Sequence, residues 1–164
     1  MMNSVSTPSE AHTSFRIDRK LQAAPAQVFS AWSRADAKQA WFSCHDDWRN
    51  SGYLLDFRIG GSEYNEVHDG DGLAHVFRAH FLDIVPDRRI VYAYDLLLGE
   101  RRISVSLVTV AFQPDAGGTL MSFTEQVVFL DGYTDHGERR EGTEVGLDKL
   151  GTWLAAQPVD AAIG

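Results

Sequence analysis

Alternating apolar and polar positions run through most of the chain and predict β-strands. The stretch TSFRIDRKL, which starts at Thr13, places Phe15 and Ile17 on one side and Arg16 and Asp18 on the other. Six later stretches carry similar signals: YLLDFRI, SEYNEVH, LAHVFRAHFLDIV, RIVYAYDLL, RISVSLVTVAF and TLMSFTEQVVF. Short glycine-rich and aspartate-rich turns separate them, which favours antiparallel neighbours over parallel crossovers.

Helical spacing of apolar residues appears in three segments. APAQVFSAWS and ADAKQAWF follow the first strand, and proline stands at an early position of the first, where its missing N–H costs nothing. The segment REGTEVGLDKLGTWL, from Arg140 to Leu154, is amphipathic. A curved antiparallel sheet with this last helix across one face would bury one surface of every element. The sequence therefore predicts an α+β fold.

The side chains on the apolar face of the last helix change in size along its length. Gly142 and Gly146 occupy the first half of that face, and Leu150 and Trp153 occupy the second half. Glycine inside a helix costs about 1 kcal/mol relative to alanine, so its repeated use needs a reason. We expect one end of the helix to fill the core and the other end to leave space, for a ligand or for another backbone.

Length and charge limit the classes of function. The 164 residues predict one domain at 13–157, with a polar tail at 1–12 and a short tail at 158–164. A net charge of −8 argues against binding to nucleic acid and to anionic membranes. The chain shows no signal peptide and no apolar run of membrane-spanning length, and its single cysteine suits a reducing compartment. These features predict a cytoplasmic protein.

Six motifs follow one another along the chain: PAQVFSAW, Trp41-Phe42, DFRIGG, DIVPDRRIVYAYD, FTEQVVFLDG and REGTEVGLDKLGTWL. Together they resemble the START-like, or SRPBCC, superfamily, and within it the Aha-type domains related to the activator of the heat-shock ATPase. The resemblance implies the helix-grip (Bet v-like) fold, in which the last helix grips a curved sheet around a hydrophobic cavity. It also implies that Gly142 and Gly146 thin the helix over that cavity.

Glu125 is the candidate residue with the clearest chemistry. It shares a strand face with Met121 and Phe123, and this apolar face is expected to turn inward. A buried carboxylate without a partner would be a candidate acid or base. An ion pair with an arginine such as Arg140, or exposure at the strand end, is the alternative interpretation.

The other candidates for a cavity wall are aromatic, polar or small residues on predicted inward faces. They are Trp41, Phe57, Glu63, His75, Phe77, Tyr92, Tyr94, Phe123, Gly142, Gly146 and Trp153. Aromatic rings at such spacing can equally belong to a plain core, and Glu63 follows a glycine pair that suits a turn at the sheet rim. No metal site is predicted, because His45, Asp46 and Asp47 have no second cluster at ligand spacing.

Three functions remain open on these grounds. The first is a non-enzymatic domain that binds an apolar or amphipathic small molecule in its cavity, without a cofactor. The second is a cyclase, isomerase or hydrolase in which Glu125, helped by Tyr92 or His75, moves a proton. The third is a chaperone-associated stress-response protein. Dedicated activators in the family carry a further amino-terminal domain, for which the short tail leaves no room, so this function ranks last.

The oligomeric state is also open. A homodimer could form through an exposed strand edge or through an aromatic patch around Trp41 and Trp48.

Overall fold

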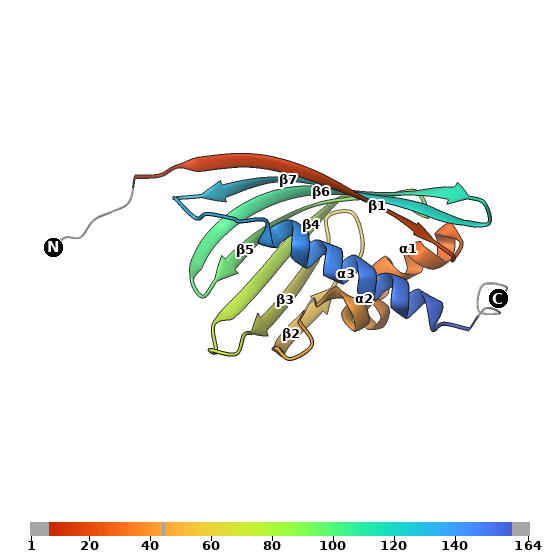
Figure 1. The fold of residues 1–164 in the computed structure, drawn as a ribbon, viewed down its shortest axis with the longest axis horizontal. Coiled ribbons are helices and arrows are strands. Elements are labelled where there is room, and N and C mark those ends of the chain that lie inside the picture. Colours follow the sequence, from red (N-terminus) through yellow and green to blue (C-terminus); the bar gives the residue numbers. More distant parts are fainter. Residues whose placement is uncertain (1–6, 44, 159–164) are drawn as a thin grey trace.

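The computed structural model describes residues 7–43 and 45–158, which form a curved antiparallel sheet and three helices (Figure 1). The elements are, in chain order, β1 (Glu10–Leu21), α1 (Pro25–Ser33), α2 (Ala35–Phe42), β2 (Arg49–Leu55), β3 (Ser62–His68), β4 (Ala74–Val85), β5 (Arg89–Leu98), β6 (Arg101–Asp115), β7 (Gly118–Leu130) and α3 (Glu138–Ala155). This is the predicted α+β helix-grip architecture, with two short helices after the first strand.

The strand order in the sheet is β1-β7-β6-β5-β4-β3-β2, so the first strand of the chain lies beside the last. Ile17 of β1 is opposite Phe123 of β7, and both side chains are buried. The helix α3 crosses the concave face of the sheet, and α1 and α2 lie beside its carboxyl-terminal half (Figure 1). The core therefore lies between the helices and one face of the sheet.

Strand alternation determines which side chains reach that core. On β6, Val108, Val110 and Phe112 are buried, whereas Leu107 and Gln113, which flank this run, are exposed. The inward residues bury apolar area at about 25 cal/mol per Å², which fixes the register, because a slip of one residue would turn all of them to solvent.

The first strand begins earlier than the sequence predicted. Glu10, Ala11 and His12 pair with Leu130, Phe129 and Val128 of β7, although their side chains are exposed. Backbone hydrogen bonds extend the strand there, and exposed side chains give no hydrophobic pattern that would predict it. Residues 10–12 therefore belong to the sheet and not to the predicted tail at 1–12. The remainder of that tail up to residue 6, and residues 159–164 of the other, lie outside the described residues.

Gly151 on α3 provides a test of helix stability away from the candidate site. A Cβ atom there would lie 3.8 Å from Leu21 Cδ2, which is ordinary van der Waals contact. We expect Gly151→Ala to raise the free energy of unfolding by about 1 kcal/mol, measured by urea denaturation, because alanine is the better helix former. Gly137→Ala is the matched control, and it should destabilise the protein because Gly137 has a φ of 94°. A destabilised Gly151→Ala variant would contradict the expectation.

Candidate functional site

A pocket of about 620 Å³ lies between α3 and the concave face of the sheet. Part of its wall is aromatic, with rings from helices, strands and loops: Trp32, Trp41, Phe42, Trp48, Phe77, Tyr92, Tyr94, Phe123 and Tyr133. Gly142 and Gly146 of α3 line the helix side. The glycine-bearing half of the helix therefore borders the pocket.

Gly146 also faces the end of a neighbouring helix. A Cβ atom at this position would lie 3.9 Å from the backbone oxygen of Phe42, at the end of α2. This distance is ordinary van der Waals contact, so of the two reasons that the sequence offered for small residues on this face, the pocket beside Gly146 is the one that applies.

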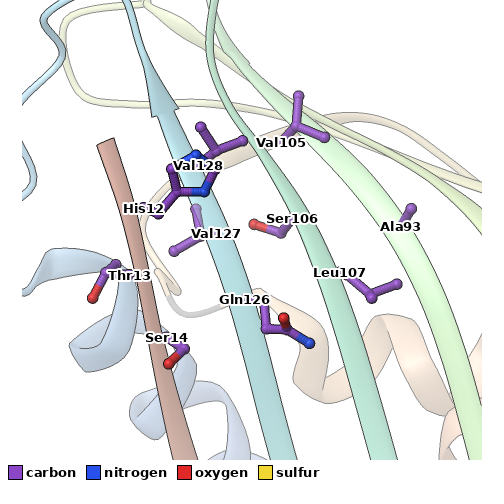
Figure 2. A pocket seen from close by; sticks show the side chains of 10 residues that line it. All are labelled: His12, Thr13, Ser14, Ala93, Val105, Ser106, Leu107, Gln126, Val127 and Val128. Atoms are coloured by element: carbon purple, nitrogen blue, oxygen red, sulfur yellow. The ribbon is translucent and has the colours of Figure 1, made fainter. Parts of the chain in front are cut away.

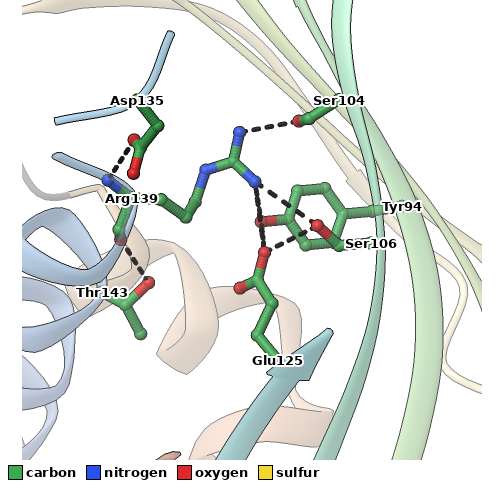
Figure 3. A network of polar contacts seen from close by, with 7 residues as sticks. All are labelled: Tyr94, Ser104, Ser106, Glu125, Asp135, Arg139 and Thr143. Carbon is green, nitrogen blue, oxygen red and sulfur yellow. Dashed lines mark hydrogen bonds and ion pairs between the residues drawn. The ribbon is translucent and has the colours of Figure 1, made fainter. Parts of the chain in front are cut away.

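A buried ion pair forms the polar end of the pocket. Glu125 on β7 and Arg139 on α3 both line the pocket, and their side chains are 1% and 11% exposed. Three donors converge on Glu125 Oε2: Tyr94 Oη at 2.6 Å, Ser106 Oγ at 2.7 Å and Arg139 Nη1 at 3.1 Å (Figure 3). These three contacts hold Oε2 in place as a hydrogen-bond acceptor.

Arg139 is held on several sides. Its Nη2 donates to Ser104 Oγ at 2.7 Å, and its guanidinium carbon lies 5.2 Å from the centre of the Phe129 ring. The carboxylate of Asp135 accepts the backbone N–H of Arg139 at 3.1 Å, which positions the first turn of α3 (Figure 3). Burial, followed by the charge of Glu125, raises the pKa of Tyr94, so its hydroxyl stays protonated as a donor.

Another part of the pocket wall is a stack of rings. The His45 and Trp48 rings are parallel at 3.7 Å between centres, and Trp48 lies 4.4 Å from His75. Asp69 Oδ2 lies 3.0 Å from His75 Nε2, and this hydrogen bond lowers the pKa of Asp69. The pocket thus has a charged, hydrogen-bonded end and an aromatic rim.

Residues 22–156 match the family model described as Activator of Hsp90 ATPase homolog 1-like protein. The chain belongs to this family. The predicted resemblance to Aha-type domains is confirmed.

Solved structures agree with this membership. A putative uncharacterized protein from Rhizobium leguminosarum is 55% identical, with a TM-score of 0.90 over 93% of this chain and 100% of that one. The Mll3558 protein from Rhizobium loti is 35% identical, with a TM-score of 0.82 over 88% and 99%. An AHSA1-like protein from Aeromonas hydrophila, 19% identical with a TM-score of 0.68 over 88% and 93%, shares the fold. No match was found among the curated proteins.

Most of the predicted cavity residues lie together in this family member. The pocket is lined by Trp41, His75, Phe77, Tyr92, Tyr94, Phe123, Glu125, Gly142 and Gly146. The remaining three lie elsewhere. Phe57 packs against Phe29 and Phe81, with ring centres 5.6 Å and 4.9 Å away. Trp153 packs half-buried against the core, and Glu63 belongs to a separate buried pair.

The predicted partner of Glu125 was wrong by one residue. Arg140 instead donates to the backbone oxygen of Arg16 at 3.3 Å and lies 3.8 Å from Glu144. Arg139 precedes Gly142 and Thr143 by three and four residues, so it extends the inward face of α3 by one turn. Extending the apolar face toward the amino end of the helix would have identified it.

Ser104 and Ser106 are two further site residues that were not predicted. They alternate with outward residues on β6 and are 0% and 2% exposed. Two serines on an otherwise apolar inward face indicate that polar groups lie nearby in the core, because buried hydroxyls are almost always hydrogen-bonded. In the structure these partners are Arg139 and Glu125.

A second buried ion pair lies outside the pocket lining. Lys38 Nζ on α2 is 2.9 Å from Glu63 Oε1 and 3.0 Å from Oε2, and the two side chains are 1% and 0% exposed. Tyr53 Oη donates to Glu63 Oε2 at 2.7 Å. The Lys38 ammonium also lies 4.3 Å from the centre of the Phe42 ring. Burial lowers the pKa of Lys38, although Glu63 acts in the opposite direction.

A hollow on the convex face of the sheet, of about 580 Å³, is shown in Figure 2. His12, Gln126 and Leu107 are among the side chains around it, from β1, β7 and β6. The described residues that line it include no Phe, Tyr or Trp. It offers a ligand far less aromatic surface than the pocket under α3.

No helix within residues 7–43 and 45–158 is both long and apolar enough to cross a membrane. Across the same residues, no group of three or more His, Cys, Asp or Glu side chains is placed to hold a metal ion.

Proposed function

We propose that the protein binds an apolar or amphipathic small molecule in the pocket between α3 and the sheet, without converting it chemically. The observation that carries this proposal is the aromatic wall around about 620 Å³. Small-molecule sites typically occupy about 300–1,000 Å³ and combine a mainly apolar wall with a few polar groups. The Glu125–Arg139 pair supplies those groups at one end.

Proton transfer by Glu125 is the enzymatic alternative. The contacts favour a positioning role, because Oε2 already accepts from Tyr94, Ser106 and Arg139. Chaperone association, which the family description suggests, would not require an open pocket.

Filling the pocket tests the proposal. We expect Gly146→Leu to weaken binding of the fluorescent probe N-phenyl-1-naphthylamine by more than about tenfold, because the added side chain must enter the space that the probe needs. The measurement is a fluorescence titration, with native mass spectrometry of freshly purified protein to detect a molecule retained from the cell.

Gly146→Ala is the matched control and should keep most of the affinity, since its Cβ atom would lie 3.9 Å from the Phe42 oxygen. Thermal unfolding of both variants checks that the fold is intact. Equal probe affinity of folded Gly146→Leu and the parent protein would overturn the proposal, as would a parent protein that binds no probe. Chaperone association, by contrast, should tolerate the leucine.

A further inference from the structure

One oxygen of the buried Glu125 carboxylate is left without a donor. All the hydrogen bonds that Glu125 receives from the described residues end on Oε2. Figure 3 shows the second oxygen, Oε1, turned away from Arg139, Tyr94 and Ser106. Glu125 is 1% exposed and lines the pocket. Because Glu125 lines the pocket, Oε1 can accept a hydrogen bond from water or from a ligand there.

The donors nearest the carboxylate already make hydrogen bonds to atoms other than Oε1. Arg139 directs Nη1 to Oε2 and Nη2 to Ser104, and Ser106 and Tyr94 direct their hydroxyl protons to Oε2. A ligand group entering the pocket is the remaining source of a donor besides water.

The charge of the residues that line the pocket also limits which ligands can bind. Four carboxylates line it, Glu125, Asp135, Glu138 and Glu141, and Arg139 is the one arginine or lysine among the described lining residues. Its charge is already paired with Glu125. The three remaining carboxylates belong to the start of α3 or to the loop just before it. A ligand carboxylate would find no unpaired arginine or lysine among these lining residues and would meet like charge.

We propose that the ligand of this pocket carries a hydrogen-bond donor, a hydroxyl or an ammonium group, on an apolar body, and that the donor binds Glu125 Oε1. Carboxylates of the same shape are rejected. This inference rests on the proposed function and adds the polar chemistry of the ligand to it. The aromatic wall accommodates the body, and it also favours a cation if the donor is ammonium.

Matched naphthalenes test the inference on the parent protein by isothermal titration calorimetry. We expect 2-naphthol to bind at least about tenfold more tightly than 2-methoxynaphthalene, which keeps the ring and oxygen but lacks the donor. Naphthalen-2-ylmethylamine supplies an ammonium donor, and 2-naphthoate supplies a carboxylate. Whichever of the two donors binds more tightly identifies the group, and 2-naphthoate should bind more weakly than either.

Glu125→Gln provides the matched variant. The amide oxygen must face Arg139, Tyr94 and Ser106, which all donate, so the amide NH₂ turns toward the pocket. The preference for 2-naphthol over 2-methoxynaphthalene should then fall by about tenfold, and 2-naphthoate should bind more tightly than to the parent protein.

The outcomes separate this inference from the proposed function. Similar affinities for 2-naphthol, 2-methoxynaphthalene and 2-naphthoate would overturn the donor requirement while leaving small-molecule binding intact. Absence of binding by all four naphthalenes would overturn both. The comparison on the parent protein decides the donor requirement even if Glu125→Gln fails to fold.

Discussion

Lys38→Met is expected to lower the free energy of unfolding by about 3–5 kcal/mol, because it removes one partner of a buried ion pair. Glu63 would lose its cationic partner in a site where its side chain is 0% exposed, and among the described residues Tyr53 would remain as its side-chain donor. Urea denaturation of parent and variant measures the difference. At this chain length, such a loss corresponds to a fall of roughly 10 °C in the melting temperature.

Two further variants show whether the cost comes from the unpaired charge. Lys38→Met combined with Glu63→Gln should recover part of the loss, because the charge disappears and Tyr53 can donate to the amide oxygen. Arg78→Met breaks an ion pair on the sheet surface, where Arg78 is 48% exposed, and should cost less than about 1 kcal/mol. If Lys38→Met costs no more than Arg78→Met, the buried pair does not stabilise the contact between α2 and β3.

Strand patterns predicted much of the candidate site. The alternation in TLMSFTEQVVF placed Phe123 and Glu125 on the same inward face, and the structure buries both. Period-two alternation works here because one face of the sheet is covered by helices and each strand must present its apolar side to them. The carboxylate and the aromatic residues that the strands contribute both followed from this one rule.

Contacts between distant charged residues could not be predicted in the same way. Lys38 and Glu63 are charged residues, and such residues are almost never fully buried unless they are paired. Their burial could therefore be predicted only if their pairing were known. Their pairing joins α2 to β3, which lie 25 positions apart in the chain, and no local pattern encodes that approach. Arg139 was different, because it extends a helical face that the sequence already showed.

The roles of the glycines of α3 could be predicted only in part. Their spacing indicated space or close approach, but the sequence could not say which. The structure shows Gly146 beside both the pocket and the Phe42 backbone, and Gly151 beside Leu21. A missing side chain identifies a position of contact only when the neighbouring element is known, so the tertiary fold was needed to assign each glycine.

Alkaline pH is expected to unfold the protein steeply, beginning near pH 10. Burial raises the pKa values of Tyr53, Tyr92 and Tyr94 above the ordinary value of 10.0, and nearby carboxylates raise them further. Above pH 10 the unfolded chain loses these protons while the folded protein keeps them. The folded state then binds more protons, so its stability falls as pH rises, and below pH 10 no such loss occurs.

The size of this effect follows from the number of tyrosines. Each contributes a slope of about 1.4 kcal/mol per pH unit, so the three together reach about 4 kcal/mol per unit. Lys38 acts in the opposite direction, since its pKa is lowered from 10.5 by burial. Its effect is confined to the range below about pH 10.5, because at higher pH the unfolded chain has also released this proton.

Tyr92→Phe isolates one contribution. Tyr92 is 3% exposed, and its hydroxyl makes no hydrogen bond to the described residues, so phenylalanine removes the titrating group with little change in packing. We expect the parent and the variant to lose stability at slopes that differ by about 1.4 kcal/mol per unit above pH 10, as measured by urea denaturation between about pH 9 and pH 11. Parallel pH profiles would mean that Tyr92 ionises in the folded protein, which requires the pocket to admit water to its hydroxyl. The same experiment thus measures how dry the aromatic wall is, and a dry wall is what an apolar ligand body needs in order to bind there.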